Sequence, residues 1–235
     1  NMEKAIVLSR QPNNPQTLYN IHRKNTSLDV YNNFILGLPG ETYDSFIDGL
    51  NDTLYNSVDT QIMIYFCQVL ENTELSRLEY REKYNIKTVK IPLAEIHSSI
   101  SDREITEYDE LVVSNSSLSI EEWKKTAVLS FTLQLFHSLK LGYYIMIYLF
   151  IKYQIKHMEF FDYLTSRKTK LSVPIINAIF DQFYETTDDI LCGKYYCKII
   201  DGCLPIYWTP EEGTYLQIID QCDQFYVELQ DVLEE

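Results

Sequence analysis

The apolar positions in the first third of the chain switch repeatedly between two periods. Short apolar runs predict strands over residues 5–9, 33–36 and 61–67, and a period near 3.6 residues predicts helices over 15–23 and 43–56. Alternating strands and helices indicate an α/β fold with a parallel sheet or part of a barrel. Three strands cannot close a barrel, so we expect the chain either to begin in the middle of such a fold or to pair with another chain.

The pattern changes after about residue 80, where helices dominate. We expect extended chain over 86–96 and 110–114, helices over 119–139 and up to 153, and further helices over 158–166, 174–191 and 220–233. Segments 195–200, 206–208 and 215–219 suggest a small β meander. The chain thus divides into an α/β part, residues 1–80, and a mainly helical α+β extension, residues 81–235.

The charge and composition exclude several classes of protein. The net charge is −14 with a pI near 4.7, so the surface repels phosphate backbones and we expect no nucleic-acid partner. Polar residues interrupt the long apolar region 127–153, which argues against a membrane span. No secretory signal opens the sequence, and five cysteines form no small disulfide framework, so we expect a cytoplasmic protein.

The most informative segment is residues 33–42, Asn-Phe-Ile-Leu-Gly-Leu-Pro-Gly-Glu-Thr. A buried-type strand runs directly into a Gly-x-Pro-Gly turn, and an amphipathic helix follows. Ligands of parallel α/β folds bind at the carboxyl ends of strands, so this loop is where we first expect a binding site.

Three segments in order resemble the radical S-adenosylmethionine (SAM) enzymes. Residues 8–11, Leu-Ser-Arg-Gln, with 18–25 resemble their fourth strand and the following helix; residues 33–42 resemble the fifth strand, "DLIxGLPGET"; and residues 65–75 resemble the sixth strand and its loop. The part after residue 80 is similar to the subgroup that carries a cobalamin-binding domain. The resemblance implies the C-terminal part of a partial (β/α)6 TIM-like barrel followed by the extension.

The resemblance also implies cofactors and site residues. Family members use SAM and a 4Fe–4S cluster to generate a radical, and this subgroup adds cobalamin. By position, Gln11 and Arg23 would contact the methionine and sulfonium region or the ribose, Asn33 the ribose and Ile35 the adenine. Gly37 would let the backbone pass close to the ligand. The implied reaction is radical methylation, cyclisation or rearrangement of a small-molecule substrate.

The sequence lacks features of the family that the chain would need to bind the cluster by itself. The CxxxCxxC cluster motif and the first three strands are missing, Asn33 replaces the usual Asp, and Pro12 replaces the usual Ser. We therefore expect this chain to be the C-terminal half of such an enzyme, and to be inactive and without bound cofactor by itself. Its partner would be the missing N-terminal half of the barrel, and an exposed strand edge would favour a homodimer.

Alternative interpretations remain open. Gln11 and Arg23 can be plain surface residues of a βα unit, and the Tyr-rich region 123–163 can make the chain a non-catalytic protein-interaction module with a degenerate barrel remnant. Cysteines without a CxxC pair are more often small buried hydrophobes than ligands of zinc or an auxiliary cluster; those concerned are Cys192, Cys197, Cys203 and Cys222. His137 fits a core histidine better than a ligand.

Overall fold

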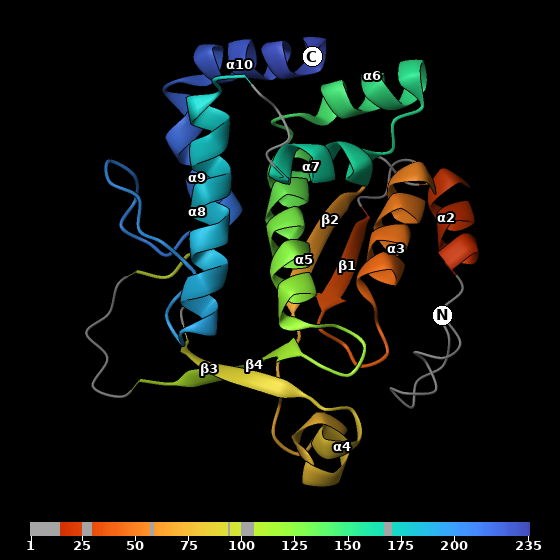
Figure 1. Cartoon of the computed structure of the whole chain (residues 1–235), viewed down its shortest axis with the longest axis vertical. Helices are drawn as coiled ribbons and strands as arrows, with labels where there is room; N and C mark the ends of the chain where they lie inside the picture. The colour runs from red at the N-terminus through yellow and green to blue at the C-terminus, as the bar shows by residue number, and fades with distance from the viewer. Residues whose placement is uncertain (1–14, 25–29, 57–58, 94, 100–105, 167–170) are drawn as a thin grey trace. The chain divides into compact units, whose positions relative to one another are not determined.

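A computed structural model describes residues 15–24, 30–56, 59–93, 95–99, 106–166 and 171–235. Helices and strands are mixed along the chain, as the α/β prediction requires (Figure 1). Its elements are α2 (Pro15–Lys24), β1 (Tyr31–Leu36), α3 (Tyr43–Asn56), β2 (Gln61–Phe66), η1 (Glu74–Ser76), α4 (Leu78–Lys83), β3 (Lys87–Pro92), β4 (Tyr108–Ser114), α5 (Ile120–Leu133), η2 (Gln134–Ser138), α6 (Tyr143–Tyr153), α7 (His157–Thr165), α8 (Pro174–Leu191), α9 (Pro210–Ile219) and α10 (Cys222–Glu234).

The described residues form two compact units. The first takes residues from 1–88 and 110–126, and the second from 89–109 and 127–235. The first unit therefore consists of two separate stretches of the chain, and the second stretch contains most of β4 and the start of α5. The boundary at residue 80 inferred from the sequence stays a prediction.

In the first unit, β1 and β2 pair in parallel and α3 connects them (Figure 1). The register is even along the whole pair, from Tyr31 opposite Gln61 to Leu36 opposite Phe66. This βαβ arrangement confirms the parallel strands expected over residues 33–36 and 61–67. The strand predicted over residues 5–9 lies outside the described residues.

Helix α3 covers one face of the strand pair. Its residues Phe46, Leu50 and Leu54, spaced four apart, are at most 2% exposed. The ring of Phe34 on β1 meets that of Phe46 edge to face with centroids 5.9 Å apart. Burial of side chains this large contributes about 1.5–3 kcal/mol each, so this stripe fixes the helix on the sheet.

The second unit is mainly helical, and one part of it corrects the sequence analysis. Residues 215–219, predicted as a strand, belong to helix α9. The side chain of Thr209 accepts a hydrogen bond from the Glu212 amide, and the Glu212 side chain accepts one from the Thr209 amide. This capping box, with Pro210 at the first helical position, starts a helix where the sequence had suggested part of a small β meander. The other segments of the expected meander form only isolated bridges, such as Lys198 with Trp208.

The long helix predicted over residues 119–139 is present but not uniform. Its first part is α5, and the chain then widens into the π-helix η2. His137 lies in η2, fully buried, with its ring 5.5 Å from that of Tyr143. No helix among the described residues is both long and apolar enough to span a membrane.

Candidate functional site

The loop after β1 is a tight turn built by its proline and glycine. The amide of Glu41 donates to the carbonyl of Leu38 at 3.2 Å, which closes a four-residue turn over residues 38–41. Gly40 occupies the third position with a φ of 83°. Proline in the second position and a residue of positive φ in the third are typical of a type II turn. The Gly-x-Pro-Gly motif therefore has a local structural cause.

Gly37 sits where the backbone passes unusually close to another strand. Its φ is 105°, and a Cβ at this position would lie 2.9 Å from the carbonyl oxygen of Val112 and 3.4 Å from Cβ of Cys67. The left-handed φ and the short distance both exclude a side chain. Glycine is thus required here by the fold of the unit, independently of any ligand.

The segment after β2 is held between β1 and β4. The Cys67 amide donates to the carbonyl of Leu36, and the Cys67 carbonyl accepts from the amide of Val112, both at 2.8 Å. Two residues later, the Val69 amide donates to the carbonyl of Glu110, again at 2.8 Å. These bonds draw the carboxyl ends of β1 and β2 and the strand β4 together.

Asn115, directly after β4, reaches back to the loop after β1. Its Nδ2 donates to the carbonyl oxygen of Gly37 at 3.1 Å and lies 3.4 Å from that of Leu38. Its Oδ1 accepts from the amide of Ser117 at 2.8 Å, and the residue is 5% exposed. The sequence analysis missed Asn115, because nothing local in the sequence links it to a loop more than 70 residues earlier.

The residues predicted to bind SAM are placed only in part. Gln11 lies outside the described residues, as does the side chain of Arg23, whose backbone belongs to α2. Asn33 and Ile35 both lie on β1 with exposed side chains, and Ile35 is 36% exposed. Gly37 follows at the start of the turn. Two of the five predicted residues thus lie at alternate positions on β1, and a third, Gly37, directly follows the strand.

The exposed face of β1 continues onto β2. In the parallel register Asn33 lies opposite Met63 and Ile35 opposite Tyr65, and Tyr65 is 50% exposed. Alternate residues of a strand point to opposite sides, so these side chains share the face opposite to the one that α3 covers. The strand pair accordingly presents an open face of mixed polar and apolar character.

The cysteines form no cluster of metal ligands with other residues that the structure describes. Among the described residues, no group of three or more His, Cys, Asp or Glu side chains is arranged to hold a metal ion. Of the four cysteines considered above, Cys197 is buried, Cys192 is exposed, and Cys203 and Cys222 are intermediate. The described part of the chain thus offers no thiolate set for zinc or an iron–sulfur cluster.

The second unit contains a buried carboxyl group. Burial raises the pKa of Glu211 to about 7, against smaller opposing effects of hydrogen bonds from its own amide and the Thr209 side chain. Burial, with the nearby Glu211 carboxylate as the next cause, raises the pKa of the Cys197 thiol to about 12. Thiols with a raised pKa are poor nucleophiles and poor metal ligands, so Cys197 is a structural residue.

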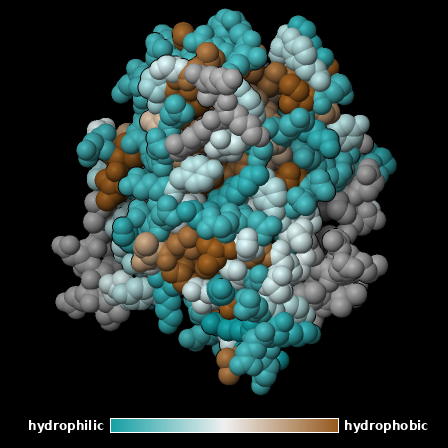
Figure 2. All heavy atoms as spheres, viewed as in Figure 1, coloured by the Kyte–Doolittle hydropathy of each residue, from teal (hydrophilic) through white to brown (hydrophobic). Residues whose placement is uncertain are grey.

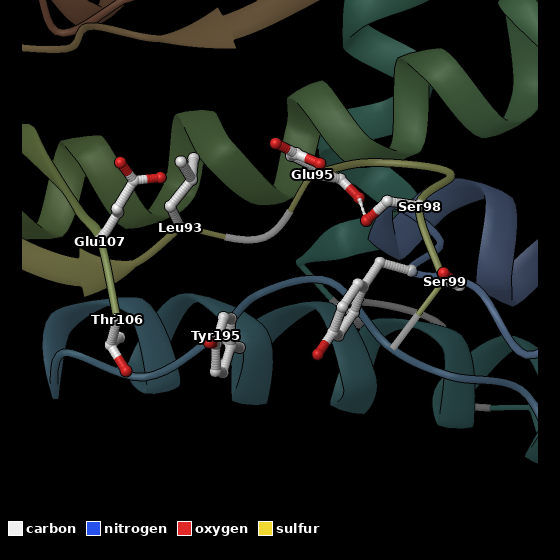
Figure 3. Close-up of a pocket in the computed structure, with 8 residues that line it drawn as sticks. Leu93, Glu95, Ser98, Ser99, Thr106, Glu107 and Tyr195 are labelled. Carbon is white, nitrogen blue, oxygen red and sulfur yellow. Dashed lines mark hydrogen bonds between the residues drawn. The ribbon is translucent and has the colours of Figure 1, made fainter. Parts of the chain in front are cut away.

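A small polar pocket also lies in the second unit (Figure 3). The hydroxyl of Ser98 on its wall donates to the backbone carbonyl of Glu95 at 2.6 Å, and the rings of Tyr195 and Tyr207 stack with centroids 6.0 Å apart. Hydroxyl and carboxyl side chains dominate the lining, which consists of Leu93, Glu95, Ser98, Ser99, Thr106, Glu107, Tyr195 and Tyr207. Figure 3 shows the Glu107 carboxyl group directed away from Tyr195, so these two described lining residues do not converge on one point.

Comparison with known proteins finds relatives of one kind. No protein-family model matches the chain. It is 24% identical over 267 aligned positions to the cobalamin-dependent radical SAM methyltransferase TokK of Streptomyces tokunonensis, covering 97% of this chain and 38% of that protein.

A second relative is the 2-(S-pantetheinyl)-carbapenam-3-carboxylate methyltransferase of Streptantibioticus cattleyicolor, also 24% identical, covering 83% of this chain and 28% of that protein. The chain thus spans less than two fifths of the length of either curated relative. The similarity to TokK confirms the predicted resemblance to radical SAM enzymes of the cobalamin-dependent subgroup.

Proposed function

We propose that this chain is the C-terminal part of a cobalamin-dependent radical SAM methyltransferase that acts on a small molecule. Strands β1 and β2 would be the fifth and sixth strands of its partial (β/α)6 barrel, and the later helices its C-terminal extension. The observation that carries the proposal is the open face of the β1–β2 pair. Asn33, Ile35 and Tyr65 are exposed on it beside the Gly37 turn, on the side of a parallel sheet that α3 leaves uncovered.

The residues present on this face suit SAM. The amide of Asn33 can donate to and accept from ribose hydroxyls, and Ile35 offers an apolar surface for adenine. Two residues along a strand correspond to roughly 7 Å, so one nucleoside can contact both side chains. When bound with a 4Fe–4S cluster, SAM supplies the radical chemistry, and the residues of this chain would bind and orient its nucleoside.

The chain by itself would be inactive. It contains no CxxxCxxC motif, so the thiolates for the cluster would come from a part of the protein upstream of this sequence. Methyl transfer through cobalamin is proposed because TokK carries that activity in its name, and a small-molecule substrate because the second relative is named for one. Gln11 and Arg23 remain proposed SAM contacts.

The first test is the DNA upstream of Asn1 in the source gene. A continuous reading frame that encodes CxxxCxxC would support the proposal. The encoded protein, reconstituted under anaerobic conditions, should then cleave SAM to 5′-deoxyadenosine. A stop codon followed by a start at Met2 would overturn it.

A pair of variants in that longer protein tests the open face itself. Asn33→Leu should weaken SAM binding at least about tenfold with little loss of stability, because this exposed side chain would lose its ribose contact. Asn32→Leu is the matched control: it faces the covered side, where its Nδ2 donates to Oγ1 of Thr60 at 2.6 Å. It should lower stability and leave SAM affinity unchanged. Equal SAM affinity in both variants would exclude this face as the nucleoside site.

A second candidate function rests on helix α6. Tyr144, Tyr148 and Ile151 lie along one side of this helix and are 80%, 51% and 68% exposed. Hydrophobic residues also reach the surface in separate patches on the face drawn in Figure 2. Such a stripe is typical of a protein-interaction surface, as expected of a non-catalytic module.

Sedimentation analysis distinguishes between two surfaces, α6 and the edge of β1, through which the isolated chain can form a dimer. If the isolated chain dimerises through α6, a variant with serine at these three positions should become monomeric. If it dimerises through the edge of β1, as the missing half-barrel suggests, the same variant should remain a dimer.

A further inference from the structure

The orientation of Asn115 is fixed by its own short turn. Its backbone amide donates to the carbonyl of Leu118 at 2.9 Å, and its backbone carbonyl accepts from the Leu118 amide at 3.3 Å. The Ser117 amide occupies its Oδ1. Since the Ser117 amide donates to the side-chain oxygen of Asn115, the NH2 group at the other end of that amide points toward the carbonyls of Gly37 and Leu38. The side chain is thus pre-oriented before it meets the loop.

We propose that Asn115 is a positioning residue for the SAM site: by binding the carbonyls of Gly37 and Leu38, it sets the orientation of the peptide unit at the end of β1. This inference rests on the function proposed above. Asn115 touches no ligand in this scheme and acts only through the loop. The backbone beside Asn33 and Ile35 would therefore depend on a residue that follows β4, 78 positions after Gly37.

Gly37 is flexible, because it has no side chain to set the orientation of its own peptide unit. Gly37 has the widest choice of φ and ψ of any residue, so its conformation must be held by its surroundings. The Asn115 amide donates to the buried carbonyl of Gly37 and, at 3.4 Å, to the partly buried carbonyl of Leu38. Its removal takes this donor from both carbonyls, although the Leu38 carbonyl keeps the Glu41 amide. The Leu38 carbonyl also closes the turn to Glu41, so the effect should extend to Gly40.

The loop is first tested in the 235-residue chain by NMR with 15N-labelled glycine. The chain has only seven glycines, so the amide signals of Gly37 and Gly40 can be resolved and assigned. Asn115→Ala should move both signals. The control Asn56→Ala removes a comparable bond, from Nδ2 to the carbonyl of Asp52 at 2.8 Å at the far end of α3, and should leave them in place.

Asn115→Asp separates the donor from the shape of the side chain. The ionised carboxylate fills the same space but has no proton to donate, whereas the protonated acid regains one O–H donor. Burial beside carbonyl oxygens disfavours the ionised form. The Gly37 signal of this variant should therefore differ from the wild-type signal at pH 8 and return toward it as the pH falls through the pKa of the new carboxyl group. A residue that only fills space would show no such return.

The SAM affinity of the longer protein, measured by equilibrium binding, tests whether the Asn115 contact affects SAM binding. Asn115→Ala should weaken it at least about fivefold, the effect of one lost hydrogen bond, while Asn56→Ala leaves it unchanged. Unmoved glycine signals, or moved signals with unchanged SAM affinity, would overturn the positioning role and leave the proposed function standing. If the wild-type longer protein does not bind SAM at all, the proposed function itself falls, and the positioning role with it.

Discussion

The buried carboxyl group of Glu211 makes a quantitative prediction about pH. A pKa of about 7 in the folded state, against an ordinary 4.5, means that the folded protein holds this proton more tightly than the unfolded chain does. The contribution of Glu211 to the free energy of unfolding is therefore fully present below pH 4.5, declines as the pH rises, and is lost above pH 7. At 1.36 kcal/mol per pH unit the loss amounts to about 3 kcal/mol.

The variant Glu211→Gln keeps the shape and cannot ionise. Near pH 4.5 its free energy of unfolding should lie close to that of the wild type, and at pH 8 it should be higher by up to about 3 kcal/mol. Urea titrations at several pH values give this difference. Trp208 provides the fluorescence signal of the second unit in a Trp123→Phe background, since these are the two tryptophans of the chain.

A control variant distinguishes burial from loss of charge alone. Glu159, in the first turn of α7, is exposed, and Glu159→Gln removes the same charge at a comparable helical position. If Glu211→Gln and the wild type differ by the same amount at pH 5 and pH 8, or if Glu159→Gln reproduces the effect, the burial argument is wrong.

Three further variants test other features. Glu228 is 2% exposed, and its side chain accepts hydrogen bonds from the backbone amides of Ile175 and Ile176 at the start of α8, at 2.9 and 3.1 Å. Glu228→Ala should therefore lower the free energy of unfolding by about 2–4 kcal/mol in a thermal or urea titration, and Glu228→Gln by less. Equal losses in the two variants would show that the charge has no role. Gly37→Ala should cost about 2 kcal/mol or more, measured by urea titration, because its Cβ would meet the Val112 carbonyl at 2.9 Å; a neutral result would refute the close approach. Burial lowers the pKa of His157, whose ring stacks on Phe150, so its contribution to the free energy of unfolding is present above pH 6.5 and lost as the pH falls. In a Glu211→Gln background, His157→Phe should abolish this loss of stability at acid pH. An unchanged dependence of the free energy of unfolding on pH would contradict this expectation.

The elements that the sequence predicted well are those with a strong local signal. Helix α3 begins and ends at the predicted residues because Phe46, Leu50 and Leu54 repeat at a helical period. The turn after β1 was equally predictable, since Pro39 and Gly40 favour a type II turn locally.

The errors have physical causes. Residues 215–219 of α9 were predicted as a strand because the preceding Pro-Glu-Glu-Gly, residues 210–213, resembles a turn. In the structure Gly213 instead allows close packing, since a Cβ there would lie 3.1 Å from Cδ1 of Ile200. The Thr209-x-x-Glu212 capping box was the signal that could have identified the helix. Asn115 could not be predicted, because its role depends on a contact between segments that only the folded chain brings together.

The two-stretch composition of the first unit has a consequence for biosynthesis. A ribosome adds roughly 5–20 residues per second, so the 78 residues between Gly37 and Asn115 take roughly 4–16 s to make. In the part of that interval that follows the synthesis of β2, the nascent β1–β2 pair lacks the strand β4 at its carboxyl end. A helper that shields exposed strands would act on this protein while it is still being translated, and a message truncated before the codon for Asn115 would yield a product in which this loop lacks its Asn115 contact.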